Sequence, residues 1–194
     1  MGLAGAAMVG PRIGKFNPDG TPNAIPGHNM AYVVTGTFIL FFGWFGFNPG
    51  STLAATDLRI ATIAVNTLLA GAAGAVAAVY YSLARTGKAD LALACNGALA
   101  GLVGITAPCA YVAPWAAVVI GAVAAFVMML TAAFVERVLK VDDPVGAVAV
   151  HAGGADSGGC WRWGSSRTAP TGTWRASSRA SGASWRRSWW RWSR

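Results

Sequence analysis

The chain has 194 residues, of which 55% are apolar and only 11% are charged, whereas about a quarter of the residues in an ordinary soluble domain are charged. This composition argues against a soluble globular protein and predicts a membrane protein. The formal charge of +8 is not spread evenly, because residues 160–194 hold eight of the 15 Lys and Arg residues and no acidic one, while residues 1–159 hold seven residues of each sign. The body of the chain is therefore neutral, and its composition does not favour nucleic-acid binding.

Apolar segments follow one another along the chain, and each is predicted to be a helix. Residues 2–10 are apolar but too short to span a membrane, since a span needs about 20 residues. The first full span is expected at 30–48, where Pro49 and Gly50 end it. Further segments lie at 60–84, 91–106, 114–139 and 144–155. We predict an all-α fold, a polytopic bundle of membrane helices within residues 1–159.

Basic residues in the loops predict how the bundle is oriented. If every full segment crosses the membrane, including the short one at 91–106, six basic residues fall on one side and Arg59 alone on the other. Lys and Arg concentrate in cytoplasmic loops, so the side with six is expected to be the cytoplasm. These six residues are Arg12, Lys15, Arg85, Lys88, Arg137 and Lys140.

The stretch FFGWFGFNPGS, residues 41–51, combines aromatic residues with glycines at the end of a span. Trp44, Phe45 and Phe47 fit an aromatic belt at the membrane interface. They also fit a site where ring faces attract a small cation or close a pore. Gly43 and Gly46 would let another backbone approach closely, and both interpretations stay open at this point.

His151 is the one strongly polar, ionisable residue well inside an apolar segment. A neutral imidazole donates from one nitrogen and accepts at the other, so it could hold a polar solute or relay a proton. A structural hydrogen bond to a neighbouring helix is the alternative. Asp142 and Asp143, just before Pro144, are predicted to cap the last helix rather than to bind a metal.

Residues 160–194 differ in character from the rest of the chain. They hold seven of the nine tryptophans and no Leu, Ile, Val or Phe, and they lack the apolar periodicity of a folded segment. We expect this Trp/Arg/Ser-rich tail to be disordered, and we interpret it as GC-rich DNA translated in a shifted frame. The alternative is a cationic tail that binds anionic lipid surfaces or nucleic acid. The chain would then be a non-transporting membrane or interaction protein, such as a tail docked on lipid or a fragment that inserts into full-length assemblies.

Four motifs, in this order and spacing, resemble the ammonium transporters of the Amt/Mep/Rh superfamily. They are GTFILFFGWFGFNPGS (36–51), AVNT (64–67), CNGALAGLVGITAPCAYV (95–112) and ERVLKVDDPVGAVAVH (136–151). The resemblance implies a cell-membrane transporter of ammonium or ammonia, not an enzyme, without cofactor or metal. It implies a homotrimer in which eleven helices of each subunit form two inverted halves around an apolar pore. The segments here would then run from the end of helix five to the start of helix ten, with Met1 inside helix five.

The resemblance also implies roles for individual residues. His151 would be the second of two pore histidines, Phe47 the second of two gating phenylalanines, and Trp44 and Thr106 would line the pore. Ser51 would belong to the outer recruitment site. The first histidine, the first gating phenylalanine and the outer-site tryptophan have no counterpart among these residues, so the chain alone is expected to be inactive.

Overall fold

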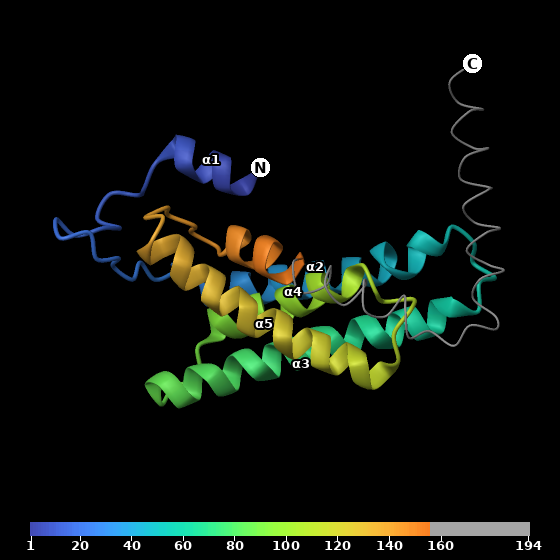
Figure 1. The fold of residues 1–194 in the computed structure, drawn as a ribbon. Helices are drawn as coiled ribbons and strands as arrows, with labels where there is room; N and C mark the ends of the chain where they lie inside the picture. The colour runs from blue at the N-terminus through green and yellow to red at the C-terminus, as the bar shows by residue number, and fades with distance from the viewer. Residues whose placement is uncertain (156–194) are drawn as a thin grey trace, which may run out of the picture.

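A computed structural model of the protein describes residues 1–155, and within this range the chain is helical (Figure 1). Residues 1–155 contain no strand, and only one isolated bridge pairs Phe16 with Pro22. The elements are α1 (Gly2–Val9), α2 (Met30–Phe47), the 3-10 helix η1 (Pro49–Thr52), α3 (Arg59–Thr86), α4 (Leu91–Thr106), α5 (Pro114–Arg137) and the π-helix η2 (Ala149–Gly153). The predicted all-α class is confirmed.

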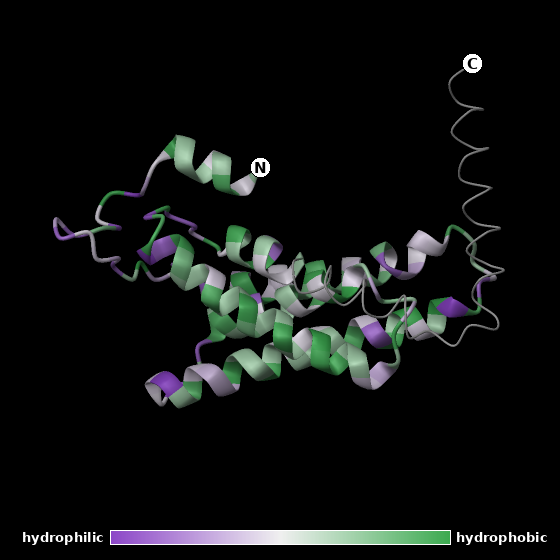
Figure 2. Ribbon diagram, in the orientation of Figure 1, coloured by the Kyte–Doolittle hydropathy of each residue, from purple (hydrophilic) through white to green (hydrophobic). Residues whose placement is uncertain are grey.

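Three stretches are long and apolar enough to cross a membrane, namely Met30–Thr52, Arg59–Thr86 and Pro114–Arg137. Apolar residues cover these helices along their length, and the polar residues gather toward the ends of the bundle (Figure 2). Helix α4 is apolar but shorter, with 16 residues. At 1.5 Å per residue it is about 24 Å long, less than the hydrocarbon thickness of about 30 Å.

The last predicted segment begins later than expected. Residues 144–146 form a turn, and helical structure runs from 147 to 155 rather than from Pro144. Gly146 has φ +72°, outside the helical region, and its N–H bonds the Asp143 carbonyl at 3.2 Å. A left-handed residue at this point interrupts a helix, which explains the shifted start. The predicted tail, residues 160–194, lies outside the described residues.

Small residues hold α3, α4 and α5 together. A Cβ atom at Gly97 of α4 would lie 2.6 Å from the Gly74 carbonyl oxygen of α3, and additions at Gly101 and Gly121 would meet the Ala70 backbone. The three helices therefore touch backbone to backbone at these positions. Lipid offers no hydrophobic drive for helix association, so such close contacts supply van der Waals attraction instead. The glycine pair spaced by four on α4 lies in the α3–α4 contact.

Part of the connection from α4 to α5 is buried against the bundle. Pro108 and Cys109 are buried, and the Asn66 side chain of α3 donates from Nδ2 to the Cys109 and Val112 carbonyls at 2.8 and 2.9 Å. Non-helical backbone at membrane depth needs partners within the protein. Asn66 provides them for two of these carbonyls, and its own Oδ1 is buried without a hydrogen-bond partner among residues 1–155.

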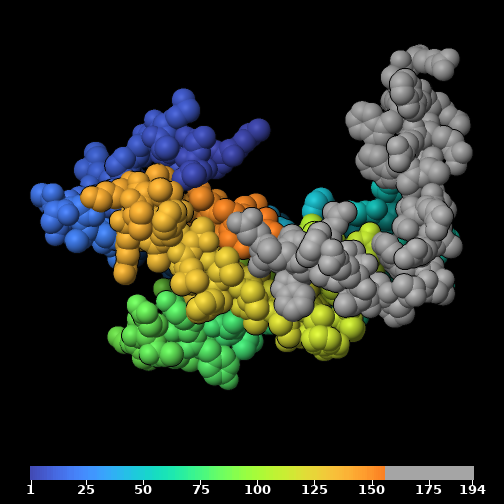
Figure 3. Space-filling model, viewed as in Figure 1, coloured from blue at the N-terminus to red at the C-terminus, as the bar shows by residue number. Residues whose placement is uncertain are grey.

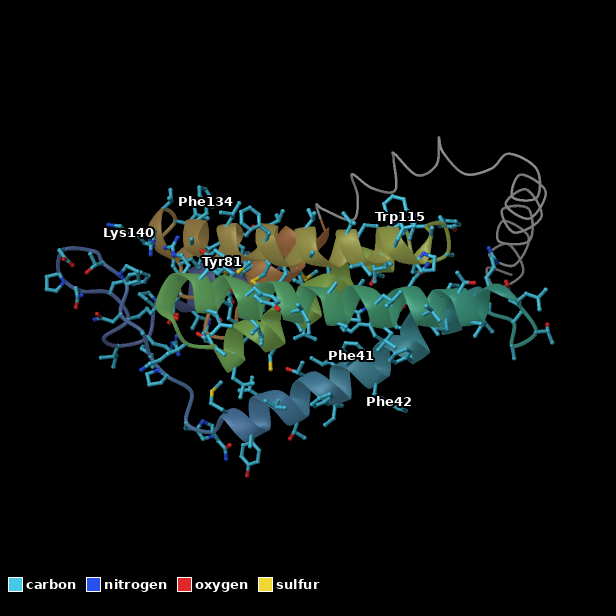
Figure 4. All side chains as sticks on the ribbon, turned by 90° about the horizontal axis from the view of Figure 1, so that it is seen from below. Phe41, Phe42, Tyr81, Trp115, Phe134 and Lys140 are labelled. Carbon is cyan, nitrogen blue, oxygen red and sulfur yellow. The ribbon has the colours of Figure 1, made fainter. Side chains whose placement is uncertain are left out.

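Helix α2 joins this bundle mainly through its C-terminal half. Its N-terminal end diverges from α3, while Phe41 points toward the bundle and Phe42 points away (Figure 4). A Cβ at Gly71 of α3 would lie 2.5 Å from the Phe41 ring, so this glycine makes room for the ring. No residue of α2 is fully buried within the described chain.

Two segments far apart in the sequence meet at one end of the bundle. Residues 10–28 lie against residues 136–143 (Figure 3), and ion pairs join them. Arg12 Nε binds Asp142 Oδ2 at 2.7 Å, and Lys15 Nζ binds Glu136 Oε1 at 2.5 Å. We call this set of contacts the polar clasp. Asp142 and Lys15 are both buried in it.

Candidate pore-lining site

A hydrogen bond between two helices fixes the orientation of Trp44. The indole Nε1 donates to Thr106 Oγ1 at 2.9 Å, and the Thr106 hydroxyl in turn donates to the Leu102 carbonyl at 2.7 Å. Both side chains are half-buried. The structure thus brings together two of the predicted pore residues, one from α2 and one from the end of α4.

Phe47 lies one turn beyond Trp44, and its ring is nearly perpendicular to the indole. The ring centroids are 6.4 Å apart and the planes are 86° apart, an arrangement favoured by the opposite charges of ring face and ring edge. Phe47 is 59% exposed. The pair therefore forms an aromatic surface that the described residues leave open on one side.

The turn after α2 holds the predicted outer residue, Ser51. Its hydroxyl donates to the Phe47 carbonyl at 2.6 Å, and the side chain is exposed. Asn48, fully buried at the start of this turn, donates from Nδ2 to Thr67 Oγ1 of α3 at 3.1 Å. Asn48 thereby ties the end of the aromatic stretch to the bundle, a role that the sequence did not suggest.

His151 lies in the π-helix η2, a rare helix type that occurs often at functional sites. Its exposed ring has Nδ1 at 3.1 Å from the Ala147 carbonyl. A carbonyl only accepts, so the neutral ring must carry its proton on Nδ1 and leave a lone pair on Nε2.

Helix α4 relates His151 to Trp44. A Cβ at Gly154, three residues after His151, would lie 3.0 Å from the Ala100 carbonyl and 3.1 Å from Val103. These residues and Thr106 lie on one helix, three to six residues apart, so the two contacts are about 5–9 Å apart along its axis. Within residues 1–155, His151 makes no hydrogen bond or ring contact with Trp44 or Phe47.

The two adjacent aspartates have different partners. Asp143 Oδ2 accepts from the Val148 and Ala149 N–H groups at 2.8 and 3.2 Å, which satisfies donors at the start of the last helix. Asp142 does not cap this helix, because its carboxylate accepts from Arg12 Nε, Nη2 and backbone N. The hydrogen bond from the Arg12 side chain is the main reason that the pKa of Asp142 lies below its ordinary value.

The glycines of the aromatic stretch are not close-contact positions within residues 1–155. No atom lies within 4 Å of a Cβ built at Gly43 or Gly46. The expected close approach of another backbone is found instead at glycines of α3, α4 and α5. Residues 1–155 also hold no cluster of His, Cys, Asp or Glu suited to a metal ion.

The donors of the site are already used inside the protein. The Trp44 N–H, the Thr106 and Ser51 hydroxyls and the His151 Nδ1–H all donate to oxygens of this chain. What remains for a solute is the Nε2 lone pair, the Ser51 oxygen and the aromatic faces. All three attract hydrogen-bond donors or cations, so the arrangement is suited to a small donor solute.

Known proteins have similar sequences. Residues 1–165 match the model of the Ammonium Transporter Family. Ammonium transporter Amt2 of Archaeoglobus fulgidus is 56% identical over 149 residues, which cover 77% of this chain and 32% of that protein. Ammonium transporter 1 member 1 of Oryza sativa subsp. japonica is 41% identical over 175 residues, covering 84% of this chain and 34% of that protein.

Solved structures of Amt and Mep proteins are similar to this chain in both fold and sequence. A Sensor Amt Protein matches with a TM-score of 0.77 and 43% identity over 80% of this chain and 38% of its own. Mep2 of Candida albicans matches with a TM-score of 0.70 and 34% identity over 80% of this chain and 34% of its own. The chain spans about a third of the length of the curated relatives it matches. On this sequence and structural similarity, the chain belongs to the Ammonium Transporter Family.

Proposed function

We propose that these residues form part of a transmembrane path for ammonium or ammonia. The proposal rests on one observation. Every side-chain donor of the site already donates a hydrogen bond to an oxygen of this chain. Ammonium has four N–H donors and no acceptor, so it matches a surface that offers a lone pair, a hydroxyl oxygen and ring faces. Anions need donors, which this surface does not supply from the named side chains, and a neutral water molecule lacks the positive charge that the ring faces attract.

In this proposal the residues act in sequence along the path. Ser51 and the rings of Phe47 and Trp44 attract the cation at the outer end. A charge is costly in an apolar passage, so the cation gives up its proton and neutral ammonia continues past the Nε2 lone pair of His151. The proton follows a separate route, and ammonia is reprotonated on the other side. Trp44 and Thr106 line the path and His151 lies within it.

We also infer that the protein lies in the cell membrane with the polar clasp in the cytoplasm. The C-terminal ends of α3 and α5 and the loop of residues 10–28 lie at one end of the bundle (Figure 1). Arg59 lies at the N-terminal end of α3, away from the other six basic loop residues. This distribution supports the expected orientation. We propose a homotrimer as the assembly of the whole protein.

The chain by itself is expected not to transport. Phe47, Ser51 and His151 are exposed in the described residues, and a passage for neutral ammonia needs walls that exclude water on every side. Expression of the 194 residues in cells that lack ammonium carriers should therefore give no growth on limiting ammonium above the empty vector. Growth above that level would contradict this part of the proposal.

A chimera tests the path itself. The 149 aligned residues would replace their counterparts in the Archaeoglobus transporter, which would then be expressed in the same cells. The chimera should restore growth, and His151→Leu and Trp44→Leu should abolish it. Gly43→Ala, next to Trp44 but with no atom of residues 1–155 within 4 Å of its added methyl, is the matched control and should grow normally. A chimera that is inserted and stable, yet unaffected by both leucine variants, would refute the proposed path.

A further inference from the structure

Among the ion pairs of residues 1–155, the pair of Arg12 and Asp142 has the most deeply buried carboxylate. Two guanidinium nitrogens and the backbone N–H of Arg12 reach the carboxylate at 2.7, 2.9 and 3.0 Å. The Asp142 side chain is only 2% exposed. Paired N–H···O bonds to a carboxylate fix its orientation as well as its position, so Arg12 holds the backbone at residue 142 in place.

The next residue transmits this restraint to the start of the last helix. Asp143 Oδ2 binds the Val148 and Ala149 N–H groups across the turn at Gly146. The first N–H groups of a helix have no partner within it, so Asp143 determines where and how this helix begins. Its carboxylate can do so only while the backbone beside it is held.

The ring of His151 depends on the same first turn. Nδ1 binds the carbonyl of Ala147, the residue directly before Val148. Movement of the helix start relative to its second turn would displace this carbonyl from the ring. The contacts therefore run without a gap from Arg12 through Asp142 and Asp143 to the His151 ring.

We propose that Arg12, Asp142 and Asp143 are positioning residues for His151. They hold the helix start so that the ring keeps its proton on Nδ1 and presents the Nε2 lone pair. The value of this arrangement rests on the proposed function of His151, but the ring state can be measured without transport. The two ideas can therefore fail separately.

The test is a nitrogen NMR measurement of the histidine tautomer. The chain has two histidines, His28 and His151, and His28→Gln assigns the signals. The full chain, ¹⁵N-labelled at histidine, is measured in lipid nanodiscs at about pH 8.5, about two units above the ordinary histidine pKa of about 6.5. Wild type should show the Nδ1–H form of His151 as the major tautomer.

Two matched variants separate positioning from general stability. Arg12→Met and Lys15→Met each remove one cation of the polar clasp from the same loop, but only Arg12 contacts the residue next to Asp143. Arg12→Met and Asp143→Ala should lower the Nδ1–H to Nε2–H ratio by about fivefold, the change expected from loss of one ordinary hydrogen bond. Lys15→Met should lower the melting temperature and leave the ratio unchanged.

A third variant keeps the test valid if Asp143→Ala does not fold. Asp143→Asn keeps one acceptor oxygen for the helix start, so it should fold and retain the wild-type ratio even if Asp143→Ala does not fold. The proposal is overturned if Arg12→Met leaves the ratio unchanged, or if Lys15→Met shifts it as much as Arg12→Met does. A chimera that fails to transport while the tautomer behaves as expected would refute the proposed function and leave the positioning role standing.

Discussion

Replacing Gly97 by alanine tests the backbone contact that holds α3 to α4. The new methyl would lie 2.5 Å from the Ala78 Cβ and 2.6 Å from the Gly74 carbonyl oxygen, whereas ordinary contacts begin at 3.4 Å. The helices must therefore separate by about 1 Å, because backbone and a Cβ cannot rotate away. Overpacking of this kind costs about 1–3 kcal/mol.

The matched control is Gly43→Ala, where the new methyl meets no other atom of the described residues within 4 Å. Alanine in a helix interior is favoured over glycine by about 1 kcal/mol, and this gain is common to both variants. The free energy of unfolding of Gly97→Ala should therefore be lower than that of Gly43→Ala by about 1–3 kcal/mol. Equilibrium unfolding in mixed detergent micelles, followed by circular dichroism, measures the difference. Equal stability of the two variants would refute the close α3–α4 contact.

Three further changes probe hydrogen bonds and charge. Trp44→Phe and Thr106→Val should each lower the free energy of unfolding by about 1 kcal/mol. The double variant should lower it by no more than either single variant, because one hydrogen bond joins the two side chains. Additive losses in the same unfolding assay would contradict this. Asn66→Leu leaves the Cys109 and Val112 carbonyls without their donor, so it should lower the free energy of unfolding by about 2 kcal/mol. An unchanged unfolding curve would argue against a buried connection between α4 and α5. Hydrogen bonds from Arg59 lower the pKa of Asp57 to about 2, so the stabilisation from this pair should be present above about pH 4 and be lost as the pH falls toward 2. In a carboxyl NMR titration, Arg59→Met should raise this pKa toward its ordinary value of about 4, because the side-chain hydrogen bonds are lost while the backbone N–H of residue 59 remains.

Local sequence signals account for the bounds of two helices. The bounds of α4 follow from Asp90, whose side chain caps the Leu93 N–H at 3.0 Å, and from the apolar run that ends at Thr106. Proline at the first position likewise starts α5 at Pro114. The last helix was placed too early, because the glycine at 146 lay inside an apolar run and its positive φ left no local signal.

The polar clasp could not be predicted from local patterns. Arg12 and Asp142 are 130 residues apart, and a loop arginine gives no indication of which distant carboxylate it will bind. From the sequence, Arg12 and Lys15 indicated only how the bundle is oriented in the membrane. Asp142 was predicted to cap the last helix. Their pairing depends on how α5 returns the chain to the end of the bundle where residues 10–28 lie.

The candidate site depends on α4 more than on the helices that carry its rings. Thr106 at the end of α4 accepts the hydrogen bond from the Trp44 indole, and Ala100 and Val103 of the same helix lie close to position 154. Helix α4 is in turn fixed by glycine contacts to α3 on one side of the bundle. A change of about 1 Å at the α3–α4 contact would therefore move Thr106 and Ala100 together relative to α2 and η2. For this reason a substitution at Gly97, which touches none of the proposed pore residues, should disturb the path through both Trp44 and His151.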